Sequence, residues 1–399
     1  MRHQGEKMNK MITIAVALVV IIAGAAATII LLDPGSNNNE RTGTPTVITD
    51  DMGRDVTVYL PVERVCMPSS DSFRSYIALE GENGIDRLVG GVGDFEGASA
   101  HYYDAFCEIY PGLKDLPGCG DFFAGTFSMV KIIDMNPDVV ILPTAAVAFD
   151  LLKAPDLQRL DSADIPYVFV DFYMDPFGEG NYERNMGIMG KVLQKEERAA
   201  EISAYFQEQV AKAYDVDLTG IAKPNVFIEI MQGPAGSPLG GYNTTSAGAP
   251  EIDYGQGYNI ARNANLPGGF GDVNLEFLQV QNPDVVILAA STSFGLAEGM
   301  MFGYGSTPTD AELEALLNEY LNRTGWSDIN AVKNGNVYII YAMFRSNVEC
   351  FATLQYAATV MYPEQYADLD PRDALVTFYE KFMPMEYKGV FAYGSDGIF

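Results

Sequence analysis

One pattern of apolar and polar positions occurs twice along the chain. The sequence Asn-Pro-Asp-Val-Val-Ile-Leu occupies residues 136–142 and returns unchanged at residues 282–288. Apolar side chains at helical spacing precede each copy, and proline cannot continue a helix, so a helix is expected to end at each Asn-Pro. The four apolar residues after each aspartate predict a buried parallel strand. The chain is therefore expected to contain two similar α/β units.

A long segment with helical periodicity lies between the two copies. Apolar residues recur at helical spacing through residues 181–214, and residues 195–198 (Lys-Glu-Glu-Arg) form a polar face. This pattern predicts one long helix that connects the two units. The alternative is a pair of shorter helices that are separated near residues 190–194.

The ends of the remaining apolar runs are the expected ligand loops, because open α/β sheets bind ligands at the carboxyl ends of their strands. Tyrosine offers a flat apolar ring with a hydroxyl group, and arginine can bind a carboxylate or phosphate with two hydrogen bonds. Packing of the tyrosines in the core and a structural ion pair for the arginine are the alternatives. The expected loops are residues 69–73, 91–94, 143–145, 171–173, 231–233, 254–258, 290–292 and 341–345. The candidate ligand-binding residues are Ser70, Asp71, Tyr102, Tyr173, Tyr242, Tyr254, Tyr258 and Arg345.

The N-terminus predicts a location outside the cytoplasm. Residues 11–32 contain no charge and follow Arg2, Lys7 and Lys10. This length can span a bilayer, and the preceding positive charges keep the N-terminus inside the cell. We expect a membrane anchor over residues 1–33 and a polar tether over 34–46; a cleaved signal peptide is the alternative.

Composition excludes several classes of function. The chain has 53 acidic and 25 basic residues and a net charge of −28, which argues against nucleic-acid partners. It has only two histidines, no G-x-S-x-G motif and no phosphate-binding G-x-x-x-x-G-K-[ST] motif. We therefore expect a protein that is not an enzyme and that has no cofactor of its own. Cys107 and Cys119 are near enough in sequence for a disulfide, and free buried thiols are the alternative.

Several segments together resemble a known family. Residues 50–56 (Asp-Asp-Met-Gly-Arg-Asp-Val) are followed by Pro61, Arg64 and Val65, and later matches are the two repeated strands, residues 190–193, 331–338 and 362–364. Over about residues 47–384 the chain resembles substrate-binding proteins of ABC importers for iron-siderophore, haem and cobalamin. The resemblance implies two α/β lobes with mainly parallel central sheets, joined by a single long helix, with the ligand between them. The lobes would be residues 47–180 and 215–399, joined by 181–214.

The resemblance also implies partners. A monomer outside the cytoplasm would capture an iron or cobalt chelate and deliver it to an ABC permease that has a separate ATPase subunit. The family docks through one acidic residue on each lobe, seven positions before the proline of each repeat. This position is Glu276 in the second lobe and Val130 in the first, where Asp121 or Asp134 are the possible substitutes. A membrane-tethered sensor or interaction protein that reuses the fold is the alternative function.

Overall fold

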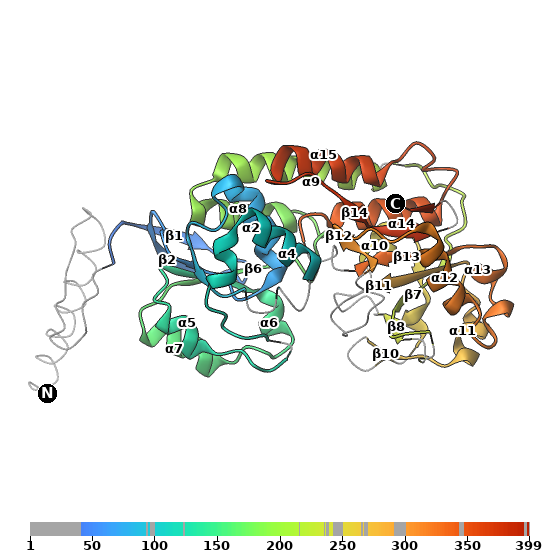
Figure 1. Ribbon diagram of the computed structural model, residues 1–399, viewed down its shortest axis with the longest axis horizontal. Coiled ribbons are helices and arrows are strands. Elements are labelled where there is room, and N and C mark those ends of the chain that lie inside the picture. Colours follow the sequence, from blue (N-terminus) through green and yellow to red (C-terminus); the bar gives the residue numbers. More distant parts are fainter. Residues whose placement is uncertain are drawn as a thin grey trace, which may run out of the picture. The chain divides into compact units, whose positions relative to one another are not determined.

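The computed structural model describes residues 41–399 with short gaps (Figure 1). The gaps are residues 93–94, 96–99, 123, 215, 235, 237–238, 242–249, 265, 267–269, 291–300, 343–346, 395–396 and 399. The expected anchor over 1–33 and most of the expected tether over 34–46 therefore lie outside the described residues. Among the residues that are described, no helix is long and apolar enough to cross a membrane.

The first lobe begins with an antiparallel hairpin and continues as a parallel sheet. The hairpin strands are β1 (Thr44–Thr49) and β2 (Asp55–Leu60), as the alternating pattern around Gly53 predicts. The sheet has the order β4-β3-β5-β6, and all of its pairs are parallel. Its strands are β3 (Val65–Cys66), β4 (Leu88–Gly90), β5 (Val139–Pro143) and β6 (Tyr167–Val170). The helices of this lobe are α2 (Phe73–Glu80), α4 (Ala100–Ile109), α5 (Met129–Asp134), α6 (Thr144–Ala148), α7 (Ala154–Ser162) and α8 (Asn181–Leu193).

The second lobe has a larger mixed sheet with a parallel centre. Its order is β10-β8-β7-β11-β13-β15-β16, with β9 also paired to β7. The central strands are parallel: β7 (Asn225–Ile230), β11 (Val285–Ala290) and β13 (Val337–Tyr341). The other strands of this sheet are β8 (Leu239–Gly241), β9 (Tyr258–Asn259), β10 (Phe270–Asp272), β15 (Ala392–Gly394) and β16 (Gly397–Ile398). Strands β12 (Gly303–Tyr304) and β14 (Gly389–Val390) pair as a separate antiparallel sheet. The helices are α10 (Pro250–Tyr254), α11 (Leu275–Gln281), α12 (Asp310–Leu321), α13 (Asn330–Lys333), α14 (Cys350–Met361) and α15 (Pro371–Phe382).

The repeated heptapeptide forms the same structure in both lobes, which confirms the prediction of two similar units. Its asparagines adopt the left-handed conformation, with φ of 46° at Asn136 and 42° at Asn282, just after α5 and α11. The Asp138 carboxylate accepts the backbone N–H groups of residues 63 and 64, each at 2.9 Å. The Asp284 carboxylate likewise accepts the N–H of Asn225 at 2.9 Å. Each repeat thus ends a helix and fixes the start of the neighbouring parallel strand.

The predicted single helix over residues 181–214 is two helices. Gln194 has a φ of 56°, and its N–H bonds to the carbonyls of Gly190 and Lys191, which ends α8. The second helix is α9 (Glu196–Tyr214). The two helices pack so closely that a Cβ on Gly190 would lie 2.7 Å from the Cβ of Ala199. The single-helix prediction was wrong because the helical period of apolar residues continues across this turn, and the alternative of two shorter helices separated near residues 190–194 is confirmed.

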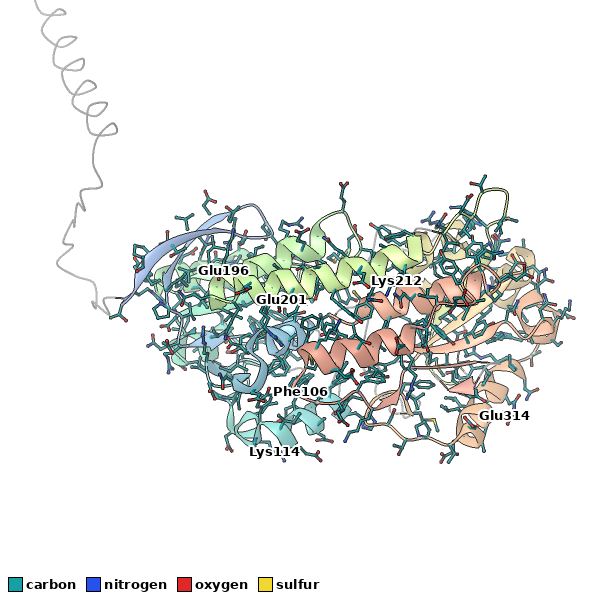
Figure 2. The ribbon with its side chains drawn as sticks, turned by 90° about the horizontal axis from the view of Figure 1, so that it is seen from above. Phe106, Lys114, Glu196, Glu201, Lys212 and Glu314 are labelled. Atoms are coloured by element: carbon teal, nitrogen blue, oxygen red, sulfur yellow. The ribbon has the colours of Figure 1, made fainter. Side chains whose placement is uncertain are left out.

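Helix α9 carries the chain from the first lobe to the second, with Glu196 near its beginning and Lys212 near its end (Figure 2). Near its beginning, Arg198 donates to the carbonyl of Ala78 in α2 at 2.6 Å. Toward its end, the carbonyl of Gln209 accepts from the Gln355 side chain of α14 at 2.7 Å. The fold is therefore two α/β lobes joined by one helix, as expected.

The first-lobe sheet separates two hydrophobic clusters. Val139 and Ile141 of β5 belong to the large core that also includes the second lobe, whereas Val140 and Leu142 face a smaller cluster. The four cysteines are free and buried, so the Cys107–Cys119 disulfide is not formed. The reason is packing: Cys107 belongs to the large core, and Cys119 belongs to the smaller cluster.

Candidate functional site

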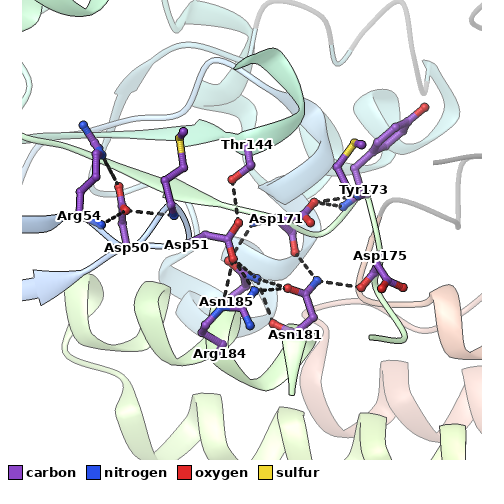
Figure 3. Close-up of polar contacts among 12 residues, drawn as sticks. Asp50, Asp51, Arg54, Thr144, Asp171, Tyr173, Asp175, Asn181, Arg184 and Asn185 are labelled. Carbon is purple, nitrogen blue, oxygen red and sulfur yellow. Dashed lines mark hydrogen bonds and ion pairs between the residues drawn. The ribbon is translucent and has the colours of Figure 1, made fainter. Parts of the chain in front are cut away.

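A polar network supports the carboxyl ends of β5 and β6 in the first lobe (Figure 3). Asp51, in the turn between β1 and β2, accepts a hydrogen bond from the Thr144 hydroxyl at 2.9 Å, directly after β5. The same carboxylate pairs with Arg184 of α8 at 2.6 Å. Its neighbour Asp50 accepts the N–H of Phe169 in β6 at 3.2 Å. Asp50 and Asp51 therefore hold the β1–β2 hairpin against the ends of β5 and β6.

The loop after β6 is fixed by a buried carboxylate. Asp171 accepts the backbone N–H groups of Tyr173 at 3.0 Å and Met174 at 2.8 Å. Burial raises the pKa of Asp171, although these two hydrogen bonds oppose the effect. The turn that they close orients Tyr173, one of the predicted ligand-binding residues.

Tyr173 forms an aromatic pair at the strand ends. Its ring packs edge-on against Phe149, with the ring centroids 6.0 Å apart. Phe149 follows α6 and is 39% exposed, and Tyr173 is half-buried. An exposed aromatic surface of this kind suits a large, flat ligand. The predicted loops 143–145 and 171–173 are therefore brought together by the fold.

Tyr254 links the second lobe to the same loop of the first. Its hydroxyl, on α10, donates to the Asp175 carboxylate, with distances of 3.0 and 3.2 Å to the two oxygens. Its ring packs edge-on against Phe177 at 5.6 Å. Burial and the Asp175 carboxylate raise the pKa of Tyr254 to about 12, so the hydroxyl stays protonated and donates.

A fully buried ion pair forms a second contact between the lobes. Arg74 Nε of α2 lies 3.0 Å from Glu349 Oε2, just before α14, and their side chains are 1% and 0% exposed. The Tyr379 hydroxyl donates to Glu349 Oε1 at 2.8 Å and lies 2.8 Å from the Tyr102 hydroxyl. The Arg74 guanidinium carbon lies 4.3 Å from the centroid of the Tyr102 ring. We call these four residues the Arg74 cluster.

Opposite charges stabilise the ionised arginine in this cluster. Burial alone lowers the pKa of Arg74, but Glu349 and the surrounding tyrosine hydroxyls outweigh it and raise the pKa above its ordinary value. Burial, reinforced by Glu349, raises the pKa of Tyr102 and Tyr379, so both hydroxyls remain protonated. The predicted ligand residue Tyr102 is therefore a buried part of the contact between lobes. Arg74 and Glu349 were missed because no motif marks either of them.

The other predicted residues have different surroundings. Ser70 is buried at the start of the turn before α2. Tyr258 lies on β9, opposite Asn225 at the amino end of β7, and its hydroxyl donates to Asn263 at 2.8 Å. The structure thus separates Tyr258 from the strand ends where it was expected, because β9 pairs with the opposite end of β7. Tyr242, Arg345 and the side chain of Asp71 lie outside the described residues.

The described part of the chain holds no group of three or more histidine, cysteine or acidic side chains that is arranged to bind a metal ion. On the outer surface, Glu276 is exposed in the first turn of α11, and Val130 is 55% exposed on α5. Of the two possible acidic substitutes, Asp121 accepts the N–H of Ala124 at 3.0 Å, and Asp134 is exposed at the end of α5.

Two α/β lobes, with a polar network that fixes the carboxyl ends of β5 and β6, are the architecture of a two-lobed solute-binding protein. Residues 124–342, more than half of the chain, match the model of a family described as periplasmic binding protein. The chain belongs to this family. Such proteins deliver ligands to the permease of an ABC transporter, a role in transport outside the cytoplasm rather than in catalysis.

Known structures resemble the chain along most of its length. The TroA-like periplasmic binding protein FepB from Veillonella parvula is 29% identical and aligns with a TM-score of 0.79, covering 88% of this chain and 99% of that chain. The molybdate-binding protein MolA of Haemophilus influenzae is 18% identical over 365 residues, covering 86% of this chain and 92% of MolA. Its structure bound to molybdate aligns with a TM-score of 0.61. Helicobacter pylori CeuE in a nickel–histidine complex is 15% identical with a TM-score of 0.60, covering 86% of this chain and 97% of CeuE. MolA and CeuE are less similar in sequence, and their likeness to this chain shows only that the fold is shared.

Proposed function

We propose that this protein binds a metal chelate between its lobes and delivers it to an ABC permease with a separate ATPase subunit. The chelate is a ferric siderophore, haem or a corrinoid. The observation that carries the proposal is the partly exposed Phe149–Tyr173 pair at the ends of β5 and β6. Chelates and macrocycles present flat, largely apolar surfaces, which aromatic rings bind well.

The metal reaches the protein inside its chelate. The described residues offer no set of three or more histidine, cysteine or acidic ligands for a bare ion. Among the structures that share the fold, CeuE is described in a nickel–histidine complex and MolA bound to molybdate, so molybdate is the comparison ligand for the proposed chelate. Residues 47–180 and 215–399 are the proposed lobes, residues 181–214 connect them, and the N-terminal segment holds the body at the membrane.

Titration of the full-length protein tests the proposal. Ferric siderophores, haemin and cobalamin are added separately, with molybdate as the comparison anion, and thermal stability is measured. A ligand at 100 times its Kd stabilises the folded state by about 2.7 kcal/mol, so a binding chelate raises Tm. An unchanged Tm with every chelate would refute the proposed ligand class, and a shift with molybdate alone would replace it.

Two variants locate the site. Phe149→Ala and Tyr173→Ala should each weaken chelate binding about tenfold, since removing an aromatic contact costs more than about 1 kcal/mol at a binding site. Tyr59→Ala is the control, because Tyr59 lies on β2 of the hairpin. Equal affinities for all three variants would show that the chelate does not contact the aromatic pair.

Exposed Val130 favours one other function, a membrane-tethered protein that reuses the fold to recruit a protein partner. Glu276 is the acidic residue at this position on α11, and the equivalent position on α5 holds the apolar Val130. Uptake of labelled chelate by cells with and without the gene separates the two functions, because a sensor or scaffold leaves uptake unchanged.

A further inference from the structure

A buried arginine holds the loop that follows β7 in the second lobe. Arg323, just after α12, donates from Nε to the carbonyl of Pro234 at 2.9 Å and from Nη2 to the carbonyl of Gly233 at 3.1 Å. The Tyr320 hydroxyl of α12 accepts the N–H of Gly233 at 3.1 Å. Three hydrogen bonds to side chains at the end of α12 therefore fix the backbone here. We call residues 231–234 the β7 loop.

Other groups hold Arg323 itself in place. The Glu229 carboxylate, one residue before the end of β7, accepts two hydrogen bonds from Arg323 Nη1, at 2.7 and 2.8 Å. The guanidinium carbon lies 4.3 Å from the centroid of the Tyr320 ring and 4.8 Å from that of the Trp326 ring. The side chains of Arg323 and Glu229 are 7% and 0% exposed. The arginine is therefore enclosed by protein groups, and it can act on a ligand only through the β7 loop.

Stability does not explain this ion pair. Burial raises the pKa of Glu229 to about 7 although Arg323 opposes the effect, so the fold disfavours the ionised carboxylate. Apolar side chains in place of a buried ion pair are often equally stable or more so. Apolar side chains cannot, however, supply the fork of donors that the carbonyls of Gly233 and Pro234 accept. The pair therefore contributes the position of the β7 loop rather than stability.

The β7 loop has room to move on one side. Pro234 and Gly236 line an open hollow of about 740 Å³ on the second lobe. Leu275 of α11 and Asn318 of α12 line the same hollow. Packing against these two helices therefore leaves space beside the loop, and the hydrogen bonds from the end of α12 decide which conformation the loop adopts.

We infer that Arg323 is a positioning residue for ligand binding, which sets the shape of the second lobe's ligand site through the β7 loop. The inference rests on the proposed function. The loop follows the carboxyl end of β7, and α/β sheets bind their ligands at this edge. A selective site needs its contacting groups held within about 0.5 Å by the residues behind them. Arg323 does this in the second lobe, as Asp171 does for the loop after β6 in the first.

Affinity measured together with stability tests the inference. The probe is the ferric siderophore, haemin or cobalamin that raises the Tm of the natural protein. In full-length Arg323→Met, the Kd for this probe should rise about tenfold at 25 °C, which corresponds to about 1.4 kcal/mol. The double variant Glu229→Met with Arg323→Met should regain most of the lost Tm. Its Kd should stay raised, because the loop carbonyls still lack their donors.

A matched control lies in the same lobe. Arg262 pairs with Asp253, and its guanidinium carbon lies 5.9 Å from the centroid of the Tyr258 ring, at the opposite end of β7. Arg262→Met thus also removes an arginine from an ion pair and an aromatic ring. Its Kd should stay within about twofold of the natural value.

Hydrogen exchange measures the loop itself. Peptides that cover residues 231–234 should exchange faster in the double variant than in the natural protein, and peptides from β5 and β6 should be unchanged. Natural Kd values in both Arg323→Met and the double variant would overturn the inference, because the ion pair would then affect stability alone. Loop exchange at the natural rate would also overturn it. Failure of the natural protein to bind any of the three probes would instead refute the proposed function.

Discussion

The Arg74 cluster should make a large contribution to stability, which single substitutions can measure. The Arg74 and Glu349 side chains are almost completely inaccessible to solvent and belong to elements of different lobes. Arg74→Met leaves the buried Glu349 carboxylate without its arginine, although the Tyr379 hydroxyl still donates to it. Glu349→Leu leaves a buried guanidinium without its carboxylate. An uncompensated buried charge costs much more than an ordinary contact is worth.

The expected size follows from the burial. Removing one partner of a buried ion pair typically costs about 3–5 kcal/mol. The body from Thr42 to Phe399 has roughly 360 residues, and unfolding entropy is about 2.1 cal/mol/K per residue, which gives roughly 0.75 kcal/mol/K. Each single variant should therefore lower Tm by about 4–7 °C. Differential scanning calorimetry of the full-length protein measures this shift.

Two further variants make the result specific. The double variant Arg74→Met with Glu349→Leu removes both charges and should recover more than half of the lost stability, because apolar replacement of a whole buried pair is often neutral. Arg159→Met breaks an exposed pair with Asp156 and should change stability by less than about 1 kcal/mol. Single variants that melt within about 1 °C of the natural protein would refute the reasoning, as would a double variant less stable than either single one.

Four other predictions follow from individual contacts. Glu229 accepts hydrogen bonds from Arg323 at 2.7 and 2.8 Å, yet burial raises the pKa of its carboxyl to about 7 from 4.5. Because this pKa is higher in the folded than in the unfolded state, the folded protein binds the proton more tightly, and the free energy of unfolding falls as pH rises from about 4.5 to about 7. Glu229→Gln removes this titration and should make Tm less dependent on pH over that range. Asn136→Ala should cost about 1 kcal/mol in urea denaturation because φ is 46° there, whereas Asn136→Gly should cost nothing. Gly190→Ala should cost about 1–3 kcal/mol, because its methyl group would lie 2.7 Å from the Cβ of Ala199; a neutral result in the same assay would contradict the close packing of α8 and α9. A thiol reagent should label none of the four buried cysteines in the folded protein and all of them in urea.

The two-lobed fold could be predicted because its main signals are local. A proline after a helical pattern and four consecutive apolar residues specify a helix, its end and a buried strand without reference to the rest of the chain. The break at Gln194 lacks such a signal, since the apolar period continues through it and the close contact of Gly190 with Ala199 exists only after α8 and α9 have folded together. The single-helix prediction failed for this reason.

The candidate site was less predictable because its contacts join distant parts of the sequence. Arg74 and Glu349 are 275 positions apart, and nothing near either residue identifies the other. Tyrosine 102 was selected for its chemistry, but the same ring and hydroxyl also suit a buried contact between lobes. Tyr258 was placed in a ligand loop by its neighbourhood in sequence, whereas the pairing of β9 with the start of β7 puts it at the other end of the sheet.

The repeat and the helices before it illustrate two different constraints. Within the heptapeptide, the asparagine has a positive φ, the proline follows the helix end, and the aspartate accepts backbone N–H groups at the start of a neighbouring strand. These constraints involve the backbone, so they recur in both lobes although the surrounding side chains differ. The outer positions of α5 and α11 have no such backbone partner and can differ between the lobes at little cost in stability. The exchange of Val130 and Asp134 on α5 for Glu276 and Val280 on α11 therefore leaves the fold of the two helices unchanged.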